Sequence, residues 1–190
     1  MKRTFFSLAL LLAVATLTAQ TKMTAREAAV KIADRILAST TYEFKNTKTG
    51  EIYKSVKKLP LDMDVKVACK YNNWHYTNGV TNMALMELGD KLGDKKYEKY
   101  VLKNMNFVFN EGNLDFFRKQ YDEAFKRDGW NAVRKLSWHM IFRGKRLDDN
   151  GPMGASLIEL QLKYPNDSFL GYINETAEHL NYGEPRLVDG

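Results

Sequence analysis

The chain has 190 residues, of which 44% are hydrophobic and 27% charged, a composition typical of a globular protein rather than a disordered or fibrous one. Lysine and arginine outnumber aspartate and glutamate by 29 to 23, but the two signs are interspersed, so we predict no nucleic-acid-binding surface and at most a weak attraction for acidic polysaccharide. The single cysteine, Cys69, excludes an intramolecular disulfide.

The first 19 residues have the features of a secretory signal peptide. Lys2 and Arg3 precede an apolar run from Phe5 to Val14, and small residues lead to Ala19. The run is too short for a permanent membrane span. We therefore expect residues 1–19 to be removed and residues 20–190 to form one periplasmic or secreted domain that has no membrane partner and no lipid anchor.

The first helix of the mature chain is expected directly after Thr24. Thr24 and Glu27 have the spacing of a capping box, in which each side chain satisfies a backbone N–H group at the helix start. Apolar residues then recur at intervals of three and four, which predicts an inward face formed by Ala29, Ile32, Ala33, Ile36 and Leu37. The helix should end near Ser39, and residues 42–70 read as an irregular connection with at most a short pair of strands between Thr41 and Tyr53.

Two segments that lie 72 positions apart resemble each other without a gap. When residues 78–101 are placed over residues 150–173, the identical pairs are Asn78/Asn150, Gly79/Gly151, Leu85/Leu157, Glu87/Glu159, Leu88/Leu160, Lys91/Lys163 and Tyr100/Tyr172. Each copy reads as a loop, a helix, a short turn and a second helix. Because one such hairpin cannot bury its apolar face alone, we predict that the copies stack side by side in a solenoid or a ring.

The turns of these hairpins follow from small and polar residues. In the first copy, the inner face of the first helix is predicted to contain Val80 or Thr81 together with Ala84, Leu85, Leu88 and Leu92. Gly93-Asp94 is expected to make the turn, and Gly112-Asn113 to close the hairpin. In the second copy the helices are predicted at 153–163 and 169–180, with loop from 181 onward. The intervening residues 114–146 should form one amphipathic helix that stops at Asp128-Gly129, followed by an apolar stretch of unassigned structure. The fold class is mainly α.

The loop before the second hairpin carries two adjacent carboxylates, Asp148 and Asp149. Pro152 suits the first position of a helix, with Asp149 or Asn150 as its cap. The acids can serve as acid or base toward a substrate, as acceptors for sugar hydroxyls, or simply as helix caps. A helix N-terminus lowers the pKa of a carboxyl group, which favours hydrogen bonding over proton donation.

The loop before the first hairpin contains Trp74 and Tyr76, which can stack on sugar rings or pack in the core. Since equivalent loops of stacked hairpins lie on the same side of the molecule, the aromatic pair and the acid pair can share one pocket. His75, His139 and His179 lack the spacing of a metal site, so we predict no metal and no cofactor.

Three motifs in this order resemble the N-terminal half of glycoside hydrolase families 88 and 105, the unsaturated glucuronyl and rhamnogalacturonyl hydrolases. They are Trp74-x-Tyr76-x-x-Gly79, Leu147-Asp148-Asp149-x-Gly151 and Arg186-x-x-Asp189-Gly190. The resemblance implies an all-α fold of helical hairpins from an (α/α)6 toroid, incomplete in this chain. It also implies a substrate pocket lined by loops on one face.

The resemblance further implies an activity: removal of a Δ4,5-unsaturated uronic acid from lyase-generated oligosaccharides of the pectin or rhamnogalacturonan type. C4 of the vinyl ether is protonated, water adds at C5, and the hemiketal opens. Asp149 matches a catalytic aspartate, and Asp148, Tyr76, Trp74 and Arg186 match substrate-binding positions. The general acid of that family lies in a Trp-x-Asp-Asp motif, which these 190 residues do not contain, so a truncated gene or a fragment is expected.

Two other hypotheses remain open at the level of sequence. One is a non-catalytic helical-repeat module that binds a sugar or a partner, and the other is a different toroid enzyme, such as a polysaccharide lyase or an inverting glycosidase.

Overall fold

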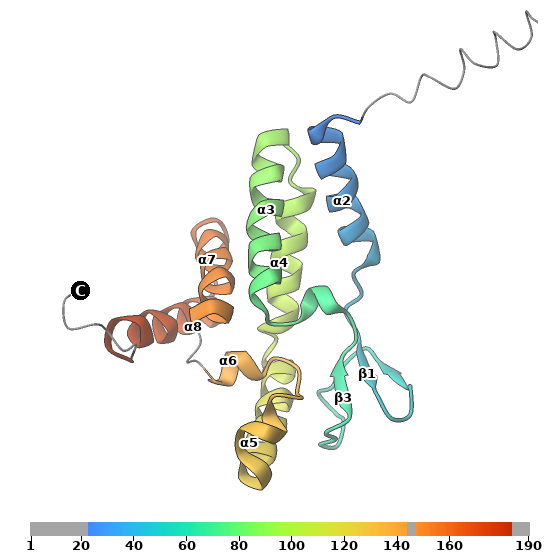
Figure 1. Cartoon of the computed structure of the whole chain (residues 1–190), viewed down its shortest axis with the longest axis vertical. Coiled ribbons are helices and arrows are strands. Elements are labelled where there is room, and N and C mark those ends of the chain that lie inside the picture. Colours follow the sequence, from blue (N-terminus) through green and yellow to red (C-terminus); the bar gives the residue numbers. More distant parts are fainter. Residues whose placement is uncertain (1–22, 144–146, 184–190) are drawn as a thin grey trace, which may run out of the picture. The chain divides into compact units, whose positions relative to one another are not determined.

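The computed structural model describes residues 23–143 and 147–183 (Figure 1). The chain divides into two compact units, one up to Asp34 and the other from Arg35 onward. In chain order the elements are α2 (Ala25–Ser39), β1 (Phe44–Asn46), β2 (Ile52–Tyr53), β3 (Val65–Val67), η1 (Lys70–Asn72), α3 (Tyr76–Leu92), α4 (Lys96–Val108), α5 (Glu111–Val133), α6 (His139–Arg143), α7 (Leu147–Lys163), α8 (Asp167–Glu178) and η2 (His179–Gly183). The prediction of a mainly helical fold is confirmed.

Helix α2 begins with the predicted capping box. The Thr24 N–H donates to Glu27 Oε2 at 2.8 Å, and the Glu27 N–H donates to Thr24 Oγ1 at 3.2 Å. The predicted inward face is wrong in part, because Ala33 is buried but Ile32 is 62% exposed. Ile36 and Leu37 are half-buried as predicted, whereas Ala29 is exposed and Val30 and Asp34 are half-buried in addition. Apolar residues occupy too much of the circumference of this helix for periodicity to select one face.

A three-stranded antiparallel sheet in the order β2-β1-β3 follows α2, so the predicted strand pair before Tyr53 is present and β3 is an addition. Phe44 of β1 is fully buried and lies in an aromatic cluster with Phe107, Phe117 and Trp138. The indole N–H of Trp138 donates to the Asn72 carbonyl at 2.7 Å. Gln120 Nε2 donates to the carbonyls of Asp62 and Val65 and so fixes β3 to α5.

The two predicted hairpins, α3–α4 and α7–α8, lie next to each other, with α3 packed along α7 (Figure 1). Near the N-terminal ends, a Cβ added to Gly79 would collide with the backbone of Pro152 and Met153. Near the C-terminal ends, Lys163 Nζ lies 3.2 Å from Asp90 Oδ1. Because both contacts join residues 73 positions apart, almost the repeat spacing, the helices are parallel and nearly in register.

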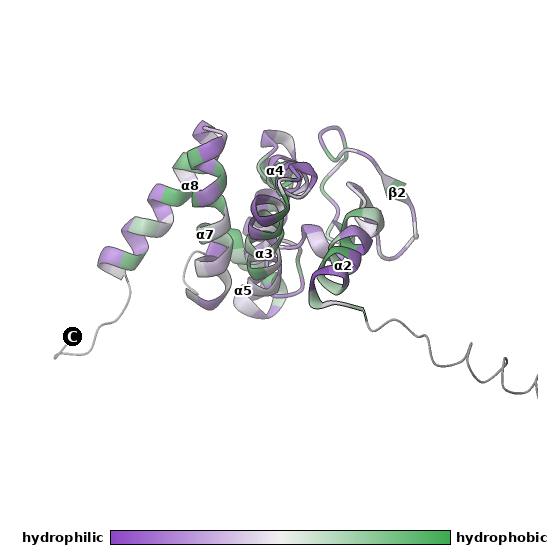
Figure 2. Cartoon of the chain, turned by 90° about the horizontal axis from the view of Figure 1, so that it is seen from above, coloured by the Kyte–Doolittle hydropathy of each residue, from purple (hydrophilic) through white to green (hydrophobic). Residues whose placement is uncertain are grey.

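The first hairpin turns at Gly93, which has the left-handed backbone (φ 66°) that favours glycine, and Asn166 caps α8 after the second turn. Figure 2 shows α8, α7 and α3 side by side when viewed from above. Leu85, Leu157, Tyr97 and Phe169, which are paired in the repeat, are all buried. These two pairs of equivalent positions therefore both contribute to the core.

Three predicted helix boundaries are wrong. Gly112-Asn113 does not close the first hairpin but lies in the first turn of α5, which is capped by Asn110. Helix α7 starts at Leu147 rather than Met153, so Pro152 is inside the helix. Residues 181–183 continue a π-helical turn instead of a loop. In each case a Gly, Asn or Pro signal was read as a boundary, whereas the residue lies inside a helix, because such local signals locate helix ends only to within a few residues.

The buried face of α3 also differs from the predicted one. Val80 is 54% exposed and Ala84 is exposed, whereas the alternative Thr81 and the predicted Leu88 and Leu92 are half-buried. Leu85 is buried as predicted, together with Asn78, Gly79, Asn82, Met86 and Gly89. This face is built from small and polar residues because α7 approaches closely at Gly79. The predicted stop at Asp128-Gly129 is confirmed as a kink inside α5, where Gly129 has φ 51°.

Candidate functional site

The first turns of α3 and α7 lie beside each other, and we refer to this end of the two helices as the rim. Asn150, in the first turn of α7, is only 3% exposed. Its Oδ1 accepts hydrogen bonds from Trp74 Nε1 at 3.0 Å and from the Tyr172 hydroxyl at 2.8 Å. One buried amide therefore ties the loop before the first hairpin to both helices of the second hairpin.

Trp74 is 2% exposed and packs edge-on against Tyr172 and Phe109, with ring centroids 5.0 and 5.8 Å apart. Burial raises the pKa of the Tyr172 hydroxyl, which keeps it protonated as a donor to Asn150. Of the two interpretations of Trp74, the structure favours the core one, because neither ring face is open to a sugar.

Tyr76 and His75 are the exposed aromatic groups at the rim. Tyr76 is 47% exposed, and its ring lies 4.6 Å from the His75 ring. His75 caps α3, since its Nδ1 accepts from the Thr77 N–H at 3.4 Å. The loop thus presents a phenol and an imidazole to solvent in a locally fixed arrangement.

The acids of the rim belong to the first turn of α7. Asp148 is exposed. The backbone of Asp149 is helical, but its side chain lies outside the described part of the chain, as does all of Arg186. The structure therefore brings together the backbone positions of Asp148, Asp149 and Tyr76 at one end of the α3–α7 pair.

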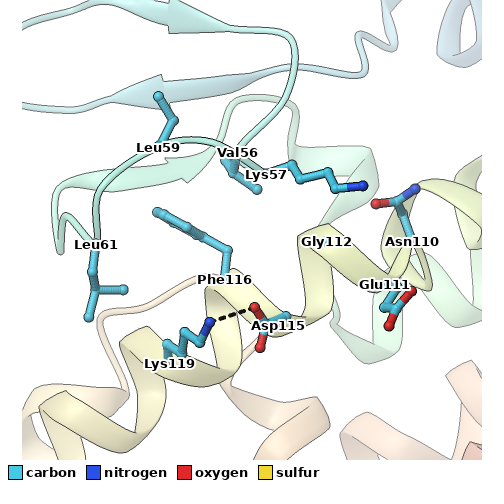
Figure 3. Close-up of a pocket in the computed structure, with 10 residues that line it drawn as sticks. All are labelled: Val56, Lys57, Leu59, Leu61, Asn110, Glu111, Gly112, Asp115, Phe116 and Lys119. Atoms are coloured by element: carbon cyan, nitrogen blue, oxygen red, sulfur yellow. Dashed lines mark hydrogen bonds and ion pairs between the residues drawn. The ribbon is translucent and has the colours of Figure 1, made fainter.

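A hollow of about 720 Å³ lies between the loop after β2 and the first turns of α5 (Figure 3). Its floor is apolar, from Val56 and Phe116, and its edge carries Lys57, Glu111 and an ion pair of 2.7 Å between Lys119 and Asp115. This hollow was not predicted, because one of its walls is an irregular loop and the other is the start of α5, which was expected at a different position. Its charges are mixed and partly neutralised, so they select no single ligand class.

A smaller groove of about 470 Å³ runs along α3 and α7. It is lined by Val80, Met83, Ala84, Met86, Glu87, Asp90, Glu159 and Lys163. At its C-terminal end, Lys163 donates to Glu98 at 2.6 Å, and the Tyr164 hydroxyl donates to the same carboxylate at 2.5 Å. These hydrogen bonds hold the pKa of Glu98 below its usual range, and Glu98 in turn raises the pKa of Lys163.

Within residues 23–143 and 147–183, no three His, Cys, Asp or Glu side chains gather in a way that could hold a metal ion. No helix in this part of the chain is long and apolar enough to cross a membrane. No protein-family model matches the sequence. No curated protein matches it either.

Proposed function

We propose that this chain carries one side of the sugar site of a helical-hairpin hydrolase that removes Δ4,5-unsaturated uronic acid from lyase-generated oligosaccharides. In this proposal Asp149 is the catalytic aspartate, and Asp148, Tyr76 and Arg186 contact the sugar. The hairpins would belong to an (α/α)6 toroid. The observation that carries the proposal is the parallel, in-register packing of two repeated hairpins, which sets their leading loops at the same end.

The chemistry of the rim suits a uronic acid. Exposed Tyr76 and His75 offer hydrogen-bonding groups and an apolar ring surface, and Asp148 offers a carboxylate that accepts from sugar hydroxyls. Trp74 takes a different role from the one predicted for it. Because its indole N–H is bonded to Asn150 in the core, Trp74 is a positioning residue that holds the start of α7 against the loop before α3.

The proposed reaction is a hydration that balances without a cofactor. A proton is added to C4 of the unsaturated ring, the oxygen of water bonds to C5, and the second proton of that water leaves to a base. The resulting hemiketal opens to a ketone by cleavage of the bond between C5 and the ring oxygen, and the hemiacetal left at C1 then collapses to an aldehyde and releases the aglycone as an alcohol. Asp149 would orient the sugar and the water, whereas the proton donor would come from a group beyond those assigned at this rim.

Binding is the primary test, because it does not require the proton donor. A lyase-generated unsaturated digalacturonate should shift the NMR signals of residues at the rim, and Asp149→Asn should weaken this binding about tenfold or more. Asp167→Asn is a matched control, since Asp167 also lies in the first turn of a helix, α8, away from the rim. Equal effects of the two substitutions, or no binding by the parent chain, would contradict the proposal.

Activity is then followed by loss of the ultraviolet absorbance of the C4–C5 double bond. A version of the protein that includes a Trp-x-Asp-Asp segment should consume the unsaturated sugar, and Asp149→Asn should abolish the reaction while leaving the helical content unchanged. Retained binding without turnover in such a version would point to the second candidate function, a helical-repeat binding module. That candidate is favoured by the exposed apolar side chains along α3 and α7, of which Val80, Ile158 and Leu162 are 54%, 46% and 77% exposed.

A further inference from the structure

The segment between the two hairpins concentrates basic and aromatic residues. Residues 114–143 contain seven Lys and Arg against four Asp and Glu, which is half of the formal excess of the whole chain. On α5, Lys119 pairs with Asp115 at 2.7 Å and Lys126 pairs with Glu123 at 2.9 Å, so these four charges cancel. The excess positive charge therefore rests mainly on arginines.

Two of these arginines are stacked on aromatic rings. The Arg143 guanidinium carbon lies 3.9 Å from the centroid of the Trp130 ring, and that of Arg118 lies 4.8 Å from the centroid of the Phe142 ring. Among the residues that the structure describes, no carboxylate forms an ion pair with either guanidinium. Stacking uses the face of a guanidinium and leaves its N–H groups free at the edge, where they match a carboxylate bidentately.

The rings around the two arginines are joined across α5 and α6, which pack against each other (Figure 1). Tyr121 contacts Phe142 at 5.7 Å and lies nearly parallel to Phe125, with 6.0 Å between centroids and 6° between planes. Phe125 is 54% exposed, whereas Tyr121, Trp130 and Phe142 are half-buried. The resulting arginine–aromatic surface consists of Arg118, Tyr121, Phe125, Trp130, Phe142 and Arg143.

We infer that the arginine–aromatic surface binds an acidic oligosaccharide, with the carboxylates of two uronate residues on Arg118 and Arg143 and the apolar face of a sugar ring on Phe125. Single-stranded nucleic acid fits less well, because the arginines already cover one face of the Trp130 and Phe142 rings and leave only Phe125 open for a base. The choice of a uronate chain among polyanions rests on the proposed function. The geometry of the arginine–aromatic surface does not depend on the proposed function, and the surface is separate from the rim.

The test is titration of the full chain with a saturated oligogalacturonate at physiological salt, followed by calorimetry or NMR. Arg118→Gln and Arg143→Gln should each weaken binding about tenfold, and the double variant should bind below detection. Arg143→Lys, which keeps the charge but loses the planar fork, should recover only part of the affinity. The double variant Lys45→Gln/Lys99→Gln is the matched control, because it removes the same charge from exposed positions outside the surface.

Phe125→Ala separates a binding defect from a folding defect, since this exposed ring contributes little to the core. It should weaken binding severalfold while the melting temperature stays within a few degrees of the parent. The inference is overturned if the parent chain does not bind oligogalacturonate or if the lysine control loses as much affinity as the arginine pair. Equal affinity for dextran sulfate or single-stranded DNA would also overturn it, by showing a general polyanion surface. Asp149→Asn should leave this binding unchanged, so a failure of the rim proposal gives a different result.

Discussion

Asn78 and Asn150 occupy equivalent positions in the two hairpins, but their side chains form hydrogen bonds with different partners. In the first hairpin, Asn78 donates from its amide nitrogen to the carbonyls of Lys70 and Asn73. In the second, Asn150 accepts through its amide oxygen from Trp74 and Tyr172. An amide can do both because it has donors and acceptors on one short side chain, so the repeat preserves a buried polar group at the helix start rather than a fixed contact.

The hairpins also differ in how far they are covered. Met86 of α3 is 4% exposed, whereas its equivalent in α7, Ile158, is 46% exposed. The side of α3 that carries Met86 meets α7, but the corresponding side of α7 is open to solvent in this chain. The same substitution at equivalent positions of the two hairpins should therefore change the free energy of unfolding by different amounts. The size of this difference reports how far each position is buried.

The largest difference is expected at the crossing of α3 and α7. Gly79→Ala should destabilise the protein by about 3 kcal/mol, because the new methyl group collides with backbone atoms of Pro152 and Met153 that cannot rotate away. Gly171→Ala, in α8, has nothing within 4 Å of the added methyl group and should stabilise the protein by up to about 1 kcal/mol. Urea denaturation of both variants compares them, and a neutral Gly79→Ala would rule out the close approach of the two hairpins.

A smaller difference is expected between the two apolar equivalents. Met86→Ala should cost about 2–3 kcal/mol, since a buried side chain leaves a cavity, while Ile158→Ala should cost less than about 1 kcal/mol. Denaturation at two protein concentrations makes this comparison sharper. A large, concentration-dependent loss in Ile158→Ala would mean that a second copy covers α7 in solution.

The next smaller difference in stability is expected between substitutions of the two buried amides, Asn150 and Asn78. Asn150→Ala should cost about 2 kcal/mol, because it leaves the Trp74 N–H and the Tyr172 hydroxyl without an acceptor in the core, whereas Asn78→Ala should cost about 1 kcal/mol. The indole N–H signal of Trp74 in NMR spectra should move upfield in Asn150→Ala only. An unchanged signal would show that this hydrogen bond does not link the hairpins.

The repeat could be read from the sequence because its signals are local or periodic. The capping box of Thr24 and Glu27, the left-handed Gly93 and the break at Gly129 depend only on neighbouring residues, and all three are where the sequence predicts them. The gapless spacing of 72 correctly predicted two hairpins side by side. Local chemistry and periodicity were therefore sufficient for the two hairpins and their order, but not for β3 or α6, which were not predicted.

Features that depend on distant partners were missed or reversed. The covered face of α3 includes Asn78, Gly79 and Asn82 because close helix packing selects small residues, while Val80 faces outward. Trp74 was predicted either to stack on a sugar ring or to pack in the core, and the sequence alone did not decide between them because its acceptor, Asn150, is 76 positions away. The stacking of Arg143 on Trp130 was hidden for the same reason, because it joins α6 to the part of α5 that follows the kink at Gly129.

The smallest expected difference concerns the two equivalent lysines, Lys91 and Lys163. Lys91 forms an exposed pair with Glu87 at 3.4 Å, whereas Lys163 donates to Glu98, which is 8% exposed. After allowance for solvent screening, Lys163→Gln should cost about 1 kcal/mol and Lys91→Gln less than about 0.3 kcal/mol.

The pH dependence of stability tests the interaction between Lys163 and Glu98. Because the folded-state pKa of Glu98 is lowered, its contribution is present above the unfolded pKa of 4.5 and is lost as the pH falls through the lower, folded value. Because the pKa of Lys163 is raised, its contribution is complete below 10.5 and is lost as the pH rises through the higher, folded value. Glu98→Gln should therefore flatten the acid limb of the melting temperature, while Glu87→Gln should leave it unchanged. If the two variants give the same acid limb, Glu98 does not join the hairpins, and their register depends on the crossing at Gly79 alone.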